Sequence, residues 1–126
     1  MRLVLDAGAL LALERGDRAA WTEVKAWHEE GLVPVTNATI LGQAWRGGGP
    51  RQARLARALP GIDVQPVDEP LGRAAGELLA RSGTRDIADA TLVALTRKGD
   101  RVLTSDPDDI ATLARHSGHA ITIVAV

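Results

Sequence analysis

The stretch of sequence that decides the fold is MRLVLDAGALLALERGD, residues 1–17. Aliphatic residues lead up to Asp6 and resume directly after it. Burying a carboxylate within an apolar run is costly unless a hydrogen bond or an opposite charge compensates for it. No basic residue directly flanks Asp6, so its partner must come from elsewhere in the fold.

Length and composition indicate an ordinary globular protein. A chain of 126 residues can bury its own core, so we predict a single domain over residues 1–126. Hydrophobic residues make up 45% and charged residues 25%, which is typical of soluble proteins. The chain has no Cys, so disulfides and thiolate metal sites are excluded, and any metal must be held by oxygen or by His. The net charge of −1 argues against a protein that coats nucleic acid, but it permits a local basic patch.

The composition also bears on location. The first apolar run contains Asp6 and continues into Glu14, Arg15 and Asp17, which is unlike a signal peptide. No uncharged apolar stretch reaches the roughly 18 residues that cross a membrane. We therefore expect a cytoplasmic protein with no membrane partner.

Strand and helix signals alternate along the chain. Short aliphatic or β-branched runs bounded by breakers predict five strands, at Arg2–Leu5, Leu32–Val35, Asp63–Val67, Arg101–Thr104 and Ala120–Val124. The segments between them predict helices, at Ala9–Glu14, Asp17–Glu30, Ala38–Arg46, Arg51–Leu59, Glu69–Ser82, Asp86–Lys98 and Pro107–Arg115. This alternation predicts an α/β sandwich, with a mostly parallel central sheet flanked by helices.

Three acidic residues occupy informative positions in this pattern. Asp6 and Asp106 follow predicted strands, and Asp89 lies one helical turn after Asp86. Parallel sheets bind ligands outside the carboxyl ends of their strands, so these carboxylates are expected to converge there. Converging carboxylates repel each other unless a cation lies between them, and hard oxygen ligands suit Mg²⁺ or Mn²⁺.

Several of the polar residues also have ordinary structural explanations. Asp86 is a typical helix N-cap, Asp109 fits the first turn of a helix, and Thr104 fits a strand. A phosphate-binding loop with Lys, a Cys nucleophile and a Gly-x-Ser-x-Gly elbow are all absent. The histidines lie away from the predicted acidic edge and are interpreted as surface residues: His28, His116 and His119.

Four motifs in a fixed order resemble the PIN-domain ribonucleases, and most closely the VapC toxins of bacterial toxin–antitoxin pairs. They are LVLDAGALLALERGD, VTNATILGQAWRGG, TRDIADATLVAL and VLTSDPDDI, and together they span most of the chain. The resemblance implies a PIN-like three-layer sandwich and an endoribonuclease that depends on Mg²⁺ or Mn²⁺. It places Asp6, Asp89 and Asp106 as the catalytic and metal-binding residues.

One position departs from the family pattern. Many members carry Glu where this chain has Gln43, and Gln can offer a carbonyl oxygen but no charge. We expect Glu14, Asp86 or Asp109 to supply the missing charge, and Thr104 to hydrogen-bond a carboxylate or the phosphate.

The resemblance also implies partners: an RNA substrate, a cognate antitoxin and a second copy in a homodimer. Arg46, Arg51, Arg54 and Arg57 form the best candidate row for RNA phosphates, the last three at helical spacing. The helical surface around Trp21, Val24 and Trp27 suits either a protein contact or the core of the protein itself.

Two other functions remain open from the sequence. An inactive PIN domain that binds protein or RNA is favoured by Gln43. A DNA nuclease or small phosphatase would use the same three carboxylates.

Overall fold

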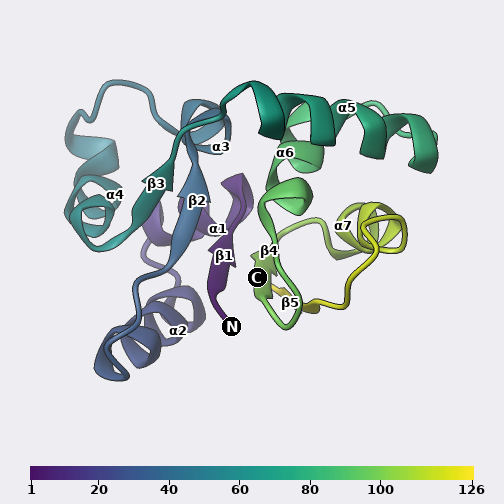
Figure 1. Ribbon diagram of the computed structural model, residues 1–126. Helices are drawn as coiled ribbons and strands as arrows, with labels where there is room; N and C mark the ends of the chain where they lie inside the picture. Colours follow the sequence, from purple (N-terminus) through teal and green to yellow (C-terminus); the bar gives the residue numbers. More distant parts are fainter.

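Five parallel strands form one sheet in the order β3-β2-β1-β4-β5 in the computed structural model, which describes residues 1–126 (Figure 1). The strands are β1 (Leu3–Leu5), β2 (Val35–Asn37), β3 (Asp63–Gln65), β4 (Arg101–Thr104) and β5 (Thr122–Ala125). The sheet is therefore entirely parallel, as the alternation of strands and helices predicts.

Seven α-helices connect the strands: α1 (Ala7–Glu14), α2 (Arg18–Glu29), α3 (Ala38–Ala44), α4 (Ala53–Ala58), α5 (Glu69–Ser82), α6 (Ile87–Leu95) and α7 (Pro107–Ala114). Two short 3₁₀ segments, η1 (Pro50–Gln52) and η2 (Leu59–Gly61), flank α4. None of these helices has the length and apolar character needed to cross a membrane.

Side-chain caps explain where most helices begin. Asp or Asn precedes each of five helices and accepts a hydrogen bond from a backbone N–H of the first turn; these caps are Asp6, Asp17, Asn37, Asp68 and Asp86. The helix α5 ends at Gly83, whose φ of 71° lies in the left-handed region that glycine readily adopts.

The strand order divides the helices between two faces. The chain moves from β1 through β2 to β3 in one direction across the sheet, and then from β4 to β5 in the other. Since parallel crossovers are right-handed, the helices before β3 cover one face and those after β3 cover the opposite face. In agreement, α1 packs against α2, α3 and α4, whereas α6 packs against α5 and α7 (Figure 1). The molecule thus has three layers.

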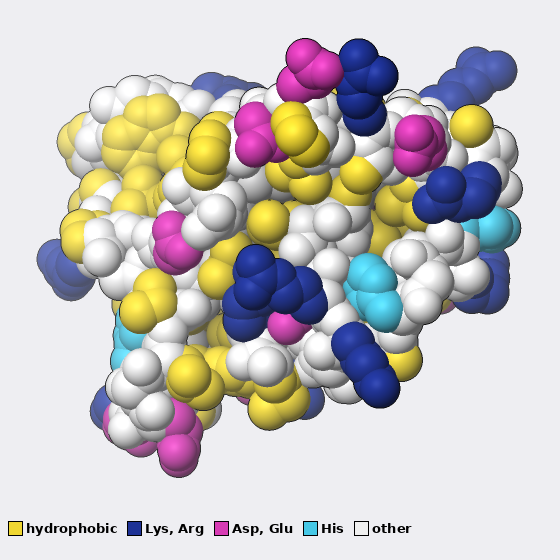
Figure 2. Space-filling model, in the orientation of Figure 1, with side chains coloured by type: hydrophobic (Ala, Val, Ile, Leu, Met, Phe, Trp, Pro, Cys, Tyr) yellow, Lys and Arg dark blue, Asp and Glu magenta, His cyan; other side chains and the backbone are white.

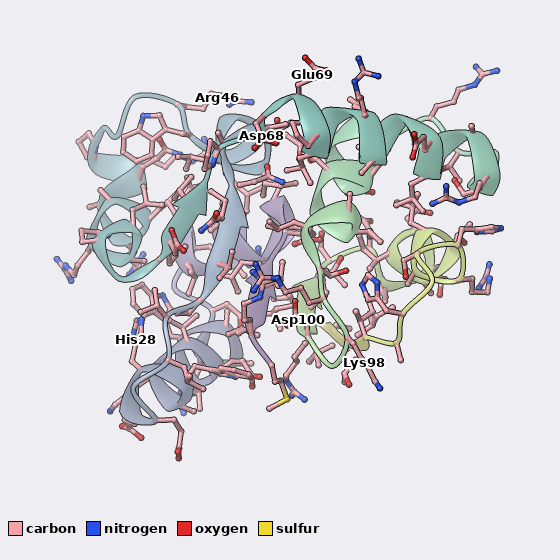
Figure 3. The ribbon with its side chains drawn as sticks, in the orientation of Figure 1. His28, Arg46, Asp68, Glu69, Lys98 and Asp100 are labelled. Carbon is pink, nitrogen blue, oxygen red and sulfur yellow. The ribbon has the colours of Figure 1, made fainter.

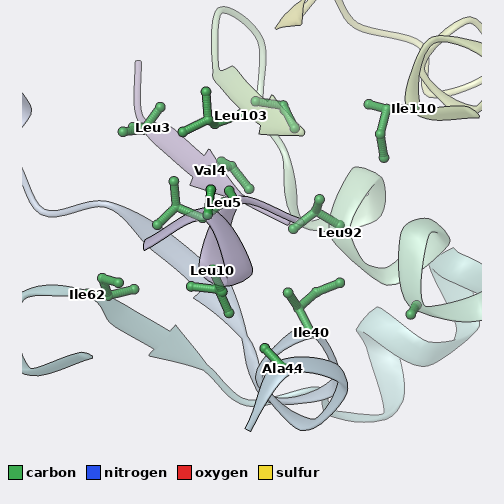
Figure 4. Packing of buried hydrophobic residues seen from close by; sticks show 14 of the residues in the cluster. Leu3, Val4, Leu5, Leu10, Ile40, Ala44, Ile62, Leu92, Leu103 and Ile110 are labelled. Atoms are coloured by element: carbon green, nitrogen blue, oxygen red, sulfur yellow. The ribbon is translucent and has the colours of Figure 1, made fainter. Parts of the chain in front are cut away.

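The core lies on both sides of the central strand. Leu3, Val4 and Leu5 of β1 are fully buried, as expected for a parallel strand covered on both faces. Figure 4 shows Val4 and Leu5 surrounded by apolar side chains that include Leu10 of α1 and Leu92 of α6. This packing fixes β1, and therefore the residue that follows it, at the middle of the molecule.

The second strand begins later in the sequence than we predicted. Leu32–Val35 was expected, but the strand begins at Val35 and continues through Thr36 to Asn37. Leu32 and Val33 are 42% and 55% exposed, so their aliphatic character does not report a buried strand. Thr36 and Asn37 are fully buried instead. Hydrogen bonds compensate for the burial of their polar groups, since Thr36 Oγ1 donates to Leu5 O at 2.8 Å and Asn37 caps α3.

A second predicted element is also shorter than expected. The helix predicted over Arg51–Leu59 is divided into η1, α4 and η2, so that α4 covers Ala53–Ala58 alone. Pro50 and Pro60 lie in the two flanking 3₁₀ segments, where their fixed φ fits a tight turn better than a helix interior.

A buried ion pair anchors the amino end of the sheet. Asp100, 1% exposed, accepts hydrogen bonds from Arg2 N at 2.9 Å, Arg2 Nη2 at 2.8 Å and Arg97 N at 2.8 Å. In Figure 3, Asp100 lies near the centre of the view, well below Arg46, which follows α3. Burial alone would raise the pKa of Asp100, but the hydrogen bonds and charge of Arg2 hold it below its usual value.

Candidate functional site

The order of the strands creates a crevice at one point on the carboxyl edge. The strands β1 and β4 are neighbours, yet their following helices depart to opposite faces of the sheet. Such a switch point is where open α/β sheets bind ligands. Asp6 directly follows β1 and Asp106 follows β4 after one residue, so both lie at this point.

Asp6 is almost completely buried, with 3% of its surface exposed. Its Oδ1 accepts a hydrogen bond from Ala9 N at 2.7 Å and so caps α1. Its Oδ2 accepts hydrogen bonds from Thr104 Oγ1 and, at 3.2 Å, from Ser105 N. Burial raises the pKa of Asp6, these hydrogen bonds oppose the increase, and the charge of Asp106 adds to it.

The turn after β4 is built around Thr104. While Thr104 Oγ1 donates to Asp6, it accepts a hydrogen bond from Asp106 N at 2.9 Å. Asp106 itself is exposed, and its side chain makes no capping hydrogen bond to α7. Its only side-chain partner is Ser105 Oγ, which donates to Asp106 Oδ2 at 3.5 Å, so the carboxylate is open to a ligand.

A glycine allows this turn to approach α1. A Cβ added at Gly8 would lie 1.9 Å from Ser105 Oγ and 2.3 Å from Ser105 Cβ, so any larger residue would displace the turn. Gly8 follows Asp6 by two positions, and its small size keeps Ser105 N within hydrogen-bonding distance of Asp6. The sequence motif "DAG" thus has a steric role that the pattern alone did not reveal.

The third carboxylate comes from α6. Asp86 caps this helix by accepting a hydrogen bond from Asp89 N at 2.9 Å, which confirms the interpretation of Asp86 as an N-cap. Burial, together with the negative charges of Asp86, Asp6, Asp106 and Asp109, raises the pKa of Asp89 to about 7. These five residues from three distant segments therefore interact, and we call them the acidic cluster.

Two adjoining hollows lie over the acidic cluster and share Asp109. One has a volume of about 210 Å³ and the other about 260 Å³. Residues around the first are Thr84, Arg85, Asp86, Asp89, Asp109, Thr112 and Leu113. Residues around the second are Ser105, Asp106, Pro107, Asp108 and Asp109.

The acidic cluster fits a hard divalent cation. None of its five carboxylates takes part in an ion pair, so their mutual repulsion is not compensated within the protein. All the available donors are carboxylate or hydroxyl oxygens, the ligands that Mg²⁺ and Mn²⁺ prefer. No three acidic or His side chains are grouped tightly enough to hold an ion by themselves. Mg²⁺ keeps several waters and often binds through one or two carboxylates, so wider spacing suits it.

Gln43 and Glu14 belong to a different part of the surface. Both line a cavity of about 430 Å³ between α1, α3 and η1, together with Leu11, Arg46 and Arg51. Glu14 Oε1 accepts a hydrogen bond from Gln52 Nε2 at 2.6 Å. Neither Gln43 nor Glu14 lines the two hollows of the acidic cluster, so their contribution to metal binding stays a prediction.

The four arginines of the predicted row come from consecutive segments of the chain, and their contact with RNA stays a prediction. Arg46 and Arg51 line the cavity beside Gln43, while Arg54 extends over Gly16, within about 3.0 Å of where a Cβ would stand. Arg57 lies in the last turn of α4 and is exposed. Arg51 belongs to η1 and precedes α4, so the helical spacing predicted for Arg51, Arg54 and Arg57 is interrupted.

The aromatic and histidine residues lie outside the acidic cluster. Trp21, Trp27 and Trp45 are partly buried against the core, and Val24 is buried. His28 Nε2 donates to Gly61 O, and His119 Nε2 shares a hydrogen bond with Thr96 Oγ1, each at 2.8 Å.

Sequence patterns missed one polar link in the core and one basic residue beside the acidic cluster. Asn37 Nδ2 donates to Thr91 Oγ1 at 3.2 Å, which joins β2 and α3 to α6 within the core. The motif "VTN" carried the signal, since two polar residues ended a strand, but the displaced strand prediction concealed it. Arg85, immediately before Asp86, was also not singled out.

Comparisons with known proteins agree with this architecture. The PIN domain family model matches residues 3–116. A chain of the structure of VapBC2 from Rickettsia felis, bound to a DNA fragment from its promoter, superimposes with a TM-score of 0.72 and 10% identity. That match covers 100% of this chain and 99% of the other. A chain of FitAB bound to an IR36 DNA fragment gives a TM-score of 0.63 and 15% identity, over 98% and 94% of the two chains. No curated protein matches the sequence closely.

Proposed function

This chain belongs to the PIN-domain family, and we propose that it is a metal-dependent endoribonuclease acting as the toxin of a toxin–antitoxin pair. PIN domains are generally nucleases that use divalent metal ions. The observation that carries the proposal is the acidic cluster, in which uncompensated carboxylates from three segments meet at the switch point of the sheet.

Each residue of the acidic cluster has a defined part in the proposed reaction. Asp6, Asp89 and Asp106 would hold Mg²⁺ or Mn²⁺, with Asp86 and Asp109 adding negative charge nearby. When bound, the ion would lower the pKa of a water and neutralise charge that develops on the phosphate. Thr104 and Ser105 N hold Asp6 in one orientation through hydrogen bonds to Oδ2, so the carboxylate is preorganised. Water then replaces one ester oxygen of the phosphodiester, and the P–O bond to that oxygen breaks.

The proposed partners follow from the family and its structural neighbours. The VapBC2 and FitAB structures are complexes of toxin and antitoxin, which supports a cognate antitoxin for this chain. An RNA substrate, a homodimer and a cytoplasmic location are parts of the same proposal. The absence of Phe and Tyr leaves few aromatic side chains for base stacking, so phosphate contacts would dominate RNA binding.

Purified protein free of antitoxin tests the proposal directly. Structured RNAs would be incubated with Mg²⁺, with Mn²⁺ and with EDTA, alongside Asp106→Asn as the matched variant. Asp106 is exposed and caps nothing through its side chain, so this change should leave the fold intact. We expect cleavage that requires the ion and falls by at least about 100-fold in the variant. Equal cleavage in EDTA, or by Asp106→Asn, would refute the proposal.

Gln43, which stands where many PIN domains have Glu, favours a second candidate function, that of an inactive PIN domain that binds protein or RNA. In that case folded wild type would bind RNA without cutting it, under any metal condition. The variant Gln43→Glu separates the two possibilities, because its new carboxylate would face the cavity that Glu14 also lines. Cleavage by Gln43→Glu but not by wild type would show that the native chain is an inactive PIN domain, whereas stronger cleavage by Gln43→Glu than by wild type would show a weakened nuclease.

A further inference from the structure

The acidic cluster presents an electrostatic problem for a nucleic-acid substrate. The whole chain carries a net charge of −1. The two hollows are lined by five carboxylates, those of Asp86, Asp89, Asp106, Asp108 and Asp109. A strand of phosphates therefore needs fixed positive charge next to the cluster but outside it. Neither hollow is lined by Arg46, Arg51, Arg54 or Arg57, so these residues do not supply charge within them.

Arg85 is the one basic residue that lines either hollow. It is exposed and takes part in none of the five ion pairs of the structure, despite the adjacent acids. The Oδ1 atom of its neighbour Asp86 is occupied by the backbone of Asp89. The guanidinium thus stands at the edge of the site with donors in a planar fork that matches a phosphate.

A second guanidinium adjoins the same hollow. Arg115, at the end of α7, donates from Nη2 to Thr112 Oγ1 at 3.2 Å, and Thr112 lines the hollow with Arg85. Arg81 in the last turn of α5 donates from Nε to His116 O at 3.3 Å, which places a third arginine close to the end of α7. In Figure 2 several Lys or Arg side chains surround the end of the molecule where α5 and α7 lie.

We propose that Arg85 and Arg115 bind backbone phosphates of a single-stranded RNA that lies across the acidic cluster. This inference rests on the proposed function, since it names how that site holds its substrate. The strand would cross the hollow beside Asp89, with one phosphate at the cluster and neighbouring phosphates at Arg85 and Arg115. Arg81 extends the basic edge beyond them.

The test measures RNA affinity separately from cleavage. A fluorescent single-stranded RNA would be titrated in Mg²⁺ against protein carrying Asp106→Asn, over a series of salt concentrations. Into this background we would introduce Arg85→Gln, Arg115→Gln and, as the matched control, Arg18→Gln. Arg18 is likewise exposed and free of ion pairs, but it begins α2 and lines neither hollow.

We expect Arg85→Gln and Arg115→Gln each to weaken binding about fivefold and to lower the slope of log affinity against log salt by about 0.7. Arg18→Gln should leave the affinity and the slope unchanged. Thermal midpoints should be similar in all variants, because Arg85, Arg115 and Arg18 are exposed and none takes part in an ion pair. Unchanged slopes for Arg85→Gln and Arg115→Gln, or an equal effect of Arg18→Gln, would overturn the inference.

The outcomes also separate this inference from the proposed function. Binding that depends on Arg85, in a protein whose wild type cuts no RNA, would retain the RNA surface and reject the nuclease. Cleavage by wild type, with binding that is indifferent to Arg85 and Arg115, would retain the nuclease and reject this surface.

Discussion

At the level of single residues, Asp89 bears a large electrostatic cost, because burial and four neighbouring carboxylates raise its pKa to about 7. Replacing it by Asn removes a charge that the folded protein does not compensate. We expect Asp89→Asn to raise stability without divalent ions by about 1 kcal/mol, which is a few degrees in Tm, and to abolish metal-dependent cleavage.

Thermal unfolding in EDTA and in Mg²⁺ checks this prediction. Wild type should gain stability from the ion, whereas Asp89→Asn should gain little. Asp108→Asn is the control, because Asp108 lines the second hollow but does not contribute to the raised pKa of Asp89. A lower Tm for Asp89→Asn in EDTA would show that the carboxylate is stabilising without a metal.

Gly8 is the second residue with a sharp expected effect. The Cβ of Gly8→Ala would overlap Ser105, so the turn after β4 must shift and Ser105 N would leave Asp6. Overpacking of this kind costs about 1–3 kcal/mol, and we expect cleavage to fall with it. Urea unfolding compares it with Gly76→Ala in α5, where a Cβ meets nothing and the helix should gain up to about 1 kcal/mol. Equal stability of Gly8→Ala and wild type would mean that the turn yields without cost.

At the level of elements, the hydrogen bonds that Asp100 accepts from Arg2 and Arg97, which we call the Asp100 clamp, join the start of β1 to the loop between α6 and β4. A carboxyl whose pKa is lowered by folding stabilises the protein above its unfolded pKa of about 3.9, and that contribution is lost as pH falls through the folded value. We therefore expect Asp100→Asn to cost about 1–3 kcal/mol at pH 7.

The pH profile of unfolding distinguishes this clamp from a general loss of packing. Wild type should lose stability below about pH 4, and Asp100→Asn should show a shallower acid limb. Asp63→Asn is a suitable control, because Asp63 is exposed and takes part in no ion pair. Parallel acid limbs for wild type and Asp100→Asn would contradict the prediction.

Element types were predictable from the sequence because breakers, caps and apolar runs are local signals. Asp6 marked the end of β1, and Asp86 marked the start of α6. The position of β2 was wrong, since burial of Thr36 and Asn37 depends on partners 31 and 54 residues away. The role of Asp100 was missed for the same reason, because its partner Arg2 lies 98 residues earlier.

At the level of the whole molecule, the acidic cluster exists only when the sheet is complete. Its members come from the ends of β1 and β4 and from the start of α6, and parallel strands bring those ends to one edge. This convergence followed from the predicted fold class, whereas the cavity that Gln43 and Glu14 share depends on how α1, α3 and η1 pack. An ion that binds the cluster would therefore bind the native state and not the unfolded chain.

Linkage makes this dependence measurable. At an ion concentration about 100 times the dissociation constant, Mg²⁺ or Mn²⁺ should stabilise the folded protein by about 2.7 kcal/mol. Because the ion would bridge three segments, hydrogen exchange should slow together at residues 6–9, 86–90 and 104–109, although they are far apart in sequence. Asp106→Asn should reduce both effects, and its fold in EDTA should match wild type. Slower exchange confined to one of the three segments would mean that the ion binds that segment alone, and the shared site would then be wrong.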